Sequence, residues 1–349
     1  MSNKKTGFKL GKLTHSYLSK LLKEFVSDLE ANNHRIVLGS KIGEDAAVID
    51  MGDNYLVAKT DPITFTTENI GFYCVNVNVN DVVCTGATPK WFQATILLPE
   101  KGTNEELIEE IFKSIHDTCK SMNIAVVGGH TEVTKGLDKP IVIGSLLGEV
   151  EKDKLIKTSG VQPGDSLILT KGIFIEGTSI IAREKESYLK DLGYSPDFIN
   201  RCKNYLYNPG ISVYKEALLA NKHYMINSCH DPTEGGLTCG IAEMSIASNL
   251  GVNVKKELIS ILPEPEELSK IFSLDPYGTI SSGSLLISIE QGSALELTEL
   301  LEKTKIKSEI IGKFTNQGNG VFFLDSNNKK SPLNYSERDQ ITKIFVNSR

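Results

Sequence analysis

The chain has 349 residues, of which 40% are hydrophobic and 23% are charged, and this length favours two domains over one compact core. Its formal net charge of −6 is not typical of a nucleic-acid-binding protein, because such proteins usually carry a basic patch. No apolar run approaches the roughly 20 residues of a membrane helix, and no apolar stretch follows the first basic residues as in a secretory signal, so we expect a cytoplasmic protein without a membrane partner.

The first half of the chain contains two clear helix patterns. Apolar residues recur at helical spacing from Thr14 to about Glu30, which predicts an amphipathic helix. Asn104 is a favourable N-cap, and Glu105 and Glu106 follow it in the first turn of a second helix. Strands are expected at about residues 35–42, 45–50, 55–60, 123–127 and 141–149.

The second half begins after a turn. Pro163-Gly164-Asp165 precedes an apolar run at 166–171, so we place the domain boundary at about residue 160 and expect domains 1–160 and 161–349. Helices are expected at about 176–186, 211–221, 236–249, 291–303 and 335–346, and strands at about 224–228, 284–289, 308–313 and 320–324. This mixture is typical of an α+β fold.

Six cysteines are spread along the chain, and none forms a Cys-x-x-Cys pair. They stand at positions 74, 84, 119, 202, 229 and 239. Their spacing matches no zinc or haem signature. The sequence therefore predicts reduced thiols, most of them buried as small apolar side chains.

Acidic residues recur in three segments of the first half. Glu44-Asp45 follows a glycine, Asp61 precedes a proline, and Asn80-Asp81 ends a stretch in which valine and asparagine alternate. Carboxylate oxygens are the ligands that Mg²⁺ prefers, although any single aspartate could equally cap a helix or a turn. The alternation alone would suggest a half-buried strand.

Two glycine pairs add candidate anion sites. Gly128-Gly129-His130-Thr131-Glu132 follows an apolar run, so we expect it where a strand ends, with backbone N–H groups open to phosphate. His230-Asp231-Pro232-Thr233-Glu234-Gly235-Gly236 precedes a helix whose N-terminus would attract an anion. Thr233 and Glu234 could equally cap that helix.

In this order, the motifs resemble the aminoimidazole ribonucleotide (AIR) synthase superfamily, which includes AIR synthase, the hydrogenase maturation factor HypE, selenophosphate synthetase and thiamine-monophosphate kinase. The resemblance extends from about Lys9 to about Phe323. It implies a two-domain α+β fold whose N-terminal domain binds ATP and has a mixed or antiparallel sheet. It also implies a helix from about Gly71 to Cys84, and a homodimer whose N-terminal sheets form a barrel with the nucleotide near the interface.

The resemblance also implies roles for individual residues. It implies that Asp45, Asp61 and Asp81 bind the Mg²⁺ ions that bridge the ATP phosphates, and Glu44 and Glu132 are weaker candidates for the same role. The implied nucleotide contacts are Asn80, Gly128, Gly129, Thr131, Thr233, Gly235 and Gly236. The implied catalytic groups are Lys9 and Lys12, which would bring positive charge to the phosphates, together with His130 and Asp231. His130 is a poor Mg²⁺ ligand, because imidazole suits softer metals.

Among the branches of the superfamily, HypE is the most similar. HypE acts on a cysteine at its extreme C-terminus, whereas the last cysteine here is Cys239, so either the carbamoyl group is carried elsewhere or the reaction is different. The predicted function is ATP-dependent activation of a carbonyl or amide oxygen, or a similar acceptor, carried by a small molecule or a protein, with a metalloenzyme maturation protein as a partner. A small-molecule kinase like thiamine-monophosphate kinase and a catalytically idle nucleotide-binding partner of a maturation complex remain alternatives.

Overall fold

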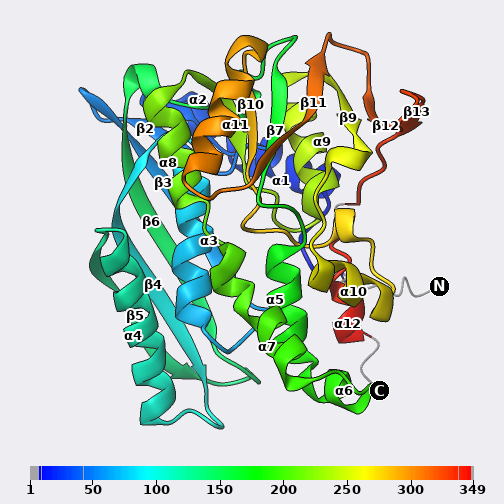
Figure 1. Ribbon diagram of the computed structural model, residues 1–349. Helices are drawn as coiled ribbons and strands as arrows, with labels where there is room; N and C mark the ends of the chain where they lie inside the picture. Colours follow the sequence, from blue (N-terminus) through cyan, green and yellow to red (C-terminus); the bar gives the residue numbers. More distant parts are fainter. Residues whose placement is uncertain (1–7, 9, 42, 337, 347–349) are drawn as a thin grey trace, which may run out of the picture.

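The computed structural model describes residues 8, 10–41, 43–336 and 338–346. Within this part of the chain, two β-sheets form two layers of the molecule, with α3 (Ile70–Cys84) between them (Figure 1). The first sheet has six strands in the order β1-β2-β3-β6-β4-β5, and the second has seven in the order β13-β12-β9-β11-β7-β10-β8. None of the described helices is both long and apolar enough to cross a membrane.

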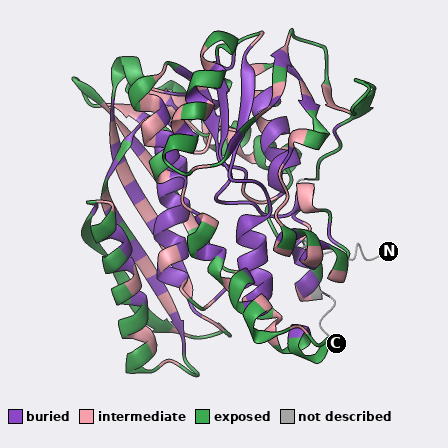
Figure 2. Ribbon diagram, viewed as in Figure 1, coloured by how far each residue is buried: buried purple, intermediate pink, exposed green. Residues whose placement is uncertain are grey.

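The first sheet is mixed, as the family resemblance implied. Its strands are antiparallel except for the parallel pair β4 and β5. Helix α3 and helix α4 (Glu105–Ser121) cover one face, and β5 forms an exposed edge (Figures 1 and 2). The strands are β1 Ile36–Leu38, β2 Ala47–Asp50, β3 Asn54–Ile63, β4 Thr88–Pro99, β5 Ala125–Thr134 and β6 Ile141–Glu151.

The second sheet belongs to the C-terminal half and is mostly antiparallel, with one parallel pair between β12 and β9. Its strands are β7 Ser166–Thr170, β8 Ile226–His230, β9 Gly251–Lys255, β10 Leu286–Ile289, β11 Ser308–Thr315, β12 Val321–Leu324 and β13 Lys330–Pro332. Its helices are α5 Ile175–Glu184, α6 Glu186–Asp191, α7 Pro196–Asn204, α8 Tyr214–His223, α9 Gly236–Ser248, α10 Pro263–Ile271, α11 Ala294–Lys303 and α12 Thr342–Val346.

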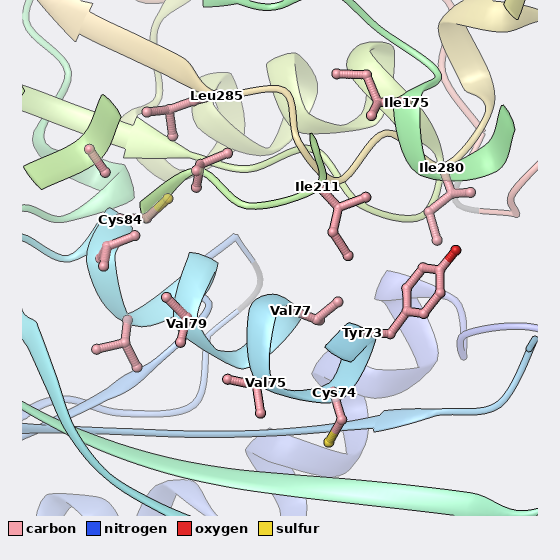
Figure 3. Close-up of a cluster of buried hydrophobic side chains, with 14 of the residues drawn as sticks. Tyr73, Cys74, Val75, Val77, Val79, Cys84, Ile175, Ile211, Ile280 and Leu285 are labelled. Carbon is pink, nitrogen blue, oxygen red and sulfur yellow. The ribbon is translucent and has the colours of Figure 1, made fainter. Parts of the chain in front are cut away.

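The central helix α3 explains the alternation of valine and asparagine. Nearly all of its residues are buried, because the first sheet packs on one side and the second half of the chain on the other (Figure 3). A helix enclosed on every side needs no polar face, so a two-residue alternation is compatible with it. The helix implied by the resemblance is therefore confirmed.

Helix α3 lies very close to the first sheet. A Cβ atom on Gly144 of β6 would stand 2.4 Å from Asn78 Nδ2, and one on Gly148 would stand 2.6 Å from Val82 Cγ1. Asn78 uses this proximity, because its side-chain oxygen accepts a hydrogen bond from the Asp61 N–H at 2.9 Å. The close packing thereby fixes β3 at Asp61.

The structure confirms some of the predicted elements and changes others. The Asn104 cap is confirmed, since its side chain accepts from the Leu107 N–H at 3.0 Å. The helix expected from Thr14 to Glu30 is divided at Val26 into α1 (His15–Phe25) and α2 (Ser27–Ala31). The helix expected over 335–346 is reduced to α12, and β4 and β9 were not predicted.

The expected strand end at Gly128-Gly129 is wrong, because β5 continues through it to Thr134. The reason is local. A Cβ atom on Gly129 would lie 2.1 Å from the carbonyl oxygen of Ala94, so this glycine lets β4 and β5 approach each other. Its place is thus explained by strand pairing within the chain.

Candidate active site

Lys59 lies at the centre of a cluster of acidic residues. It shares one face of β3 with Asp61, two residues further along the strand, and its Nζ lies 3.2 Å from Asp61 Oδ2. The same Nζ lies 2.9 Å from Oδ2 of Asp81, which comes from α3. Only 14% of the Lys59 side chain is exposed, and the surrounding carboxylates hold its pKa well above the usual value despite burial. Lys59 therefore carries a largely enclosed positive charge.

A second chain of ionic contacts joins the two halves of the protein. His230, at the end of β8, places Nδ1 at 2.8 Å from Asp45 Oδ2 and Nε2 at 3.0 Å from Glu243 Oε2. Burial lowers the pKa of His230, but the two carboxylates outweigh it and raise that pKa well above 6.5. His230 is thus an imidazolium between two carboxylates.

Asp45, Asp81 and Asp231 converge between the two halves. One carboxylate oxygen of each lies within 4.8 Å of the others. Burial raises the pKa of Asp81 well above its usual range and raises the pKa of Asp231 to about 7, with the charge of Asp45 adding to both effects. Among the described residues, the buried Oδ2 of Asp231 receives no hydrogen bond of ordinary geometry. These three carboxylates repel one another and include an oxygen without such a hydrogen bond, so they form a donor set suited to a hard divalent cation.

The glycine turn of the second half lies beside this cluster. Gly235 and Gly236, both at positive φ, lead into α9. The Gly235 N–H donates to Asp339 Oδ2 at 2.7 Å. We expected an external anion at this helix N-terminus, and a carboxylate of the chain itself lies there instead. Lys12 lies over this turn, with its Nζ 2.7 Å from Glu234 Oε2 and 3.4 Å from Thr233 Oγ1.

Two further predicted residues have other partners. Glu44 accepts backbone N–H groups of Thr158 and Ser159 at 3.1 and 3.2 Å, so its carboxylate holds the segment between the two halves instead of joining the acidic cluster. Asn80 is buried and bonds the backbone at Ile211 and Val213, both at 2.9 Å. Asn80 thereby fixes α3 to the second half.

The predicted residues on β5 do not reach the acidic cluster within one chain. The register places Asp61 opposite Gly144, Gly144 opposite Ala94, and Ala94 opposite Gly129. Three strand spacings, roughly 14 Å, therefore separate Asp61 from Gly129. His130, Thr131 and Glu132 follow on the exposed strand, where His130 Nε2 contacts Glu132 Oε2 at 3.0 Å, and Gly128 precedes them. Lys9 lies outside the described residues.

Sequence reasoning missed several groups that contact the cluster or its partners. Lys59 had a local signal, because it stands two residues before Asp61 in a predicted strand. Asn78, His15 and Glu243 had none, because their partners are distant in the sequence and meet only in the fold.

Comparisons with known proteins agree with this architecture. The model for the AIR synthase related protein N-terminal domain matches residues 43–150, and that for the C-terminal domain matches residues 162–325. A protein of Methanocaldococcus jannaschii, provisionally named a hydrogenase expression/formation protein, is 29% identical over 320 residues, which cover 88% of this chain and 91% of that protein.

Solved structures are similar in fold. HypE in its complex with HypF superposes with a TM-score of 0.72 at 20% identity and covers 90% of this chain and 99% of its own. HypE in complex with ATP gives 0.70 at 20% identity, covering 93% and 96%. ThiL in complex with AMPPCP and TMP gives 0.68 at 19% identity, covering 93% and 97%. Both domain models match in order over most of the chain, and the protein therefore belongs to the AIR synthase-related family.

Proposed function

We propose that this protein is an ATP-dependent enzyme that transfers a phosphoryl group from MgATP to an acceptor, in a HypE-like step of hydrogenase maturation. One observation carries the proposal: Asp45, Asp81 and Asp231 converge from both halves of the chain beside the largely enclosed Lys59. Similar structures hold ATP or AMPPCP, and the M. jannaschii relative is named for hydrogenase formation, which supports this assignment.

The residues fit the magnesium that the family implies. Asp45, Asp81 and Asp231 would hold it, because their carboxylates supply hard oxygen ligands and the buried Oδ2 of Asp231 receives no hydrogen bond of ordinary geometry from the described residues. Bound Mg²⁺ would neutralise charge on the phosphates during transfer. Lys59 holds Asp61 and Asp81 in place, and Lys12 at the rim brings a second positive charge.

In the proposed reaction, an oxygen of the acceptor attacks the γ-phosphorus of ATP. The bond from that phosphorus to the β,γ-bridging oxygen breaks, and ADP leaves. The chain contributes mainly by position and charge, as is usual for phosphoryl transfer. A HypE–HypF complex among the similar structures supports a maturation protein as partner, which would present a protein-borne acceptor.

We also propose that two copies pair through β5. This strand is exposed along its length and forms the edge of its sheet, and Val126, Val127 and Val133 are 51%, 50% and 56% exposed. An unprotected apolar edge strand favours pairing with another strand. In such a dimer, His130 and Glu132 would act on the nucleotide held by the partner chain, because they lie too far from Asp61 of their own chain.

The dimer is tested by sedimentation of the wild type and of Val127→Lys. The substitution should shift the protein to monomer, because it places charge in the paired edge. Met225→Lys is the matched control, since Met225 is an exposed apolar residue in the second half. A wild type that sediments as a monomer at all concentrations would exclude this interface.

The enzyme proposal is tested by calorimetric titration of MgATP into the wild type and Asp81→Asn, with ADP formation measured in parallel. Asp81→Asn should lose most of the affinity. Asp117→Asn, on the exposed face of α4, is the control and should bind normally. Unchanged affinity of Asp81→Asn would refute the site.

ADP formation separates the remaining functions. Slow turnover that rises with a protein acceptor favours the HypE-like reaction, and turnover that rises with a small phosphate ester favours a kinase like thiamine-monophosphate kinase. Tight binding without any turnover favours a nucleotide-binding partner of a maturation complex.

A further inference from the structure

A second group of metal-ligating side chains lies next to the acidic cluster. One ligand atom each of His15, Cys239 and Glu243 lies within 4.8 Å of the other two. Cys239 and Glu243 are four residues apart on α9, so they project from the same face of that helix. His15 is the first residue of α1, and the fold brings it to this face although it lies more than 200 residues earlier in the sequence.

We propose that His15, Cys239 and Glu243 form a binding site for a transition-metal ion of the zinc class. A thiolate, an imidazole and a carboxylate are the ligand types that Zn²⁺ accepts, whereas Mg²⁺ selects oxygen. The two neighbouring sites would therefore take different metals. This inference does not depend on the proposed ATP chemistry, because it uses none of the three clustered aspartates.

The spacing of the ligand atoms suits a tetrahedral ion. Nε2 of His15 lies 3.4 Å from Oε1 of Glu243. Nitrogen and oxygen ligands at about 2.0–2.2 Å from a tetrahedral zinc ion are about 3.4 Å apart. This pair thus already has the required separation. Three protein ligands leave the fourth position for water or a substrate atom, which is the arrangement of catalytic zinc sites.

The surroundings orient these ligands. The other oxygen of Glu243 contacts His230 Nε2 at 3.0 Å, and this contact fixes the carboxylate and leaves Oε1 facing His15. A Cβ atom on Gly235 would lie 3.0 Å from Cys239 Sγ, so a glycine at that turn leaves room for the sulfur. The Glu243 and His15 side chains are 19% and 20% exposed, which allows an ion to enter.

His230 also links the two sites. Its Nδ1 contacts Asp45 of the acidic cluster at 2.8 Å, while its Nε2 contacts Glu243. The charge of Lys12, the nearby lysine, is balanced by Glu234 at 2.7 Å. A thiolate and a carboxylate would neutralise the divalent ion, so the site needs no further anion.

The test is a Co²⁺ titration of the full chain after treatment with chelator, in excess Mg²⁺ so that the oxygen-rich cluster is filled. Thiolate ligation gives a sulfur-to-cobalt charge-transfer band, and tetrahedral geometry gives intense visible bands. We expect both bands to saturate at one Co²⁺ per chain and Zn²⁺ to abolish them. Absence of the charge-transfer band in the wild type would overturn the proposal.

Variants assign the ligands. Cys239→Ser should remove the charge-transfer band and weaken Co²⁺ binding at least about tenfold. Cys202→Ser, which changes a buried thiol on α7, should leave both unchanged. If Cys239→Ser does not fold, His15→Gln tests the site at a partly exposed position and should weaken binding similarly. Retention of the band in Cys239→Ser, or wild-type affinity in a folded His15→Gln, would refute the site.

Discussion

Replacing Lys59 by methionine removes the largely enclosed ammonium and keeps most of the side-chain volume. In the wild type this ammonium lies 2.9 Å from Asp81 and 3.2 Å from Asp61. The side chain of Asp81 is only 4% exposed, so water cannot take over the role of the lysine. Without a bound cation, the variant must therefore either bury an unpaired charge or protonate Asp81.

The size of the effect follows from these two choices. Removing one partner of a buried ion pair costs about 3–5 kcal/mol. Burial already raises the pKa of Asp81, so protonation relieves part of the charge and we expect a loss of about 3 kcal/mol. A divalent cation would restore the missing charge. At a hundredfold excess over its Kd, binding stabilises by about 2.7 kcal/mol.

The assay is urea unfolding of the wild type and Lys59→Met, each with chelator and with Mg²⁺. We expect Mg²⁺ to stabilise the variant more than the wild type, in which Lys59 competes with the ion for the Asp81 carboxylate. Lys152→Met is the control, because Lys152 pairs with Asp50 at 2.7 Å on the surface and its loss should have little effect. An equal Mg²⁺ effect in wild type and Lys59→Met would refute the proposed competition.

Three other predictions concern buried packing and strand pairing. Burial raises the pKa of Glu176 from 4.5 to about 8, so the folded protein keeps this proton at a pH where the unfolded chain loses it. The free energy of unfolding is therefore highest below pH 4.5 and falls as the pH rises toward 8. Urea unfolding across this range should show Glu176→Gln gaining about 3 kcal/mol on the wild type between pH 4.5 and 7. Asn80→Ala should cost about 2–4 kcal/mol in the same assay, because it leaves two buried backbone groups at Ile211 and Val213 without partners; a loss below that of an exposed alanine substitution would contradict the interdomain role. Gly129→Ala should lower hydrogen-exchange protection along β5, since its Cβ would lie 2.1 Å from a carbonyl oxygen of β4; unchanged protection would show that the strands can separate without loss.

Elements with local signals were predictable. Asn104 followed by two glutamates identifies a helix start, and the structure has the expected cap. Strand β4 lacked such a signal, because its long run begins with Thr88-Pro89 and its neighbours β5 and β6 come later in the chain. Helix α3 was predictable only from the family resemblance, since its burial on all sides removes the usual periodicity.

The candidate site shows the same division. Asp45, Asp61 and Asp81 were selected from the sequence as one set. The fold places them around Lys59, and their charges raise the pKa of this lysine. Their role as metal ligands stays a prediction. The identity of their partners could not be foreseen, because His230 comes from the opposite half and reaches Asp45 only after the two halves pack.

Charge balance explains why the two halves must close around this site. Asp45, Asp61, Asp81 and Asp231 supply four carboxylates, and Lys59 and His230 supply two cations, so two negative charges remain when the four aspartates are ionised, before Glu243 on His230 is counted. One divalent ion neutralises that remainder. Each half alone would hold an incomplete set, since Asp231 and His230 come from the second half and the other groups from the first. We therefore expect metal binding and packing of the two halves to stabilise each other.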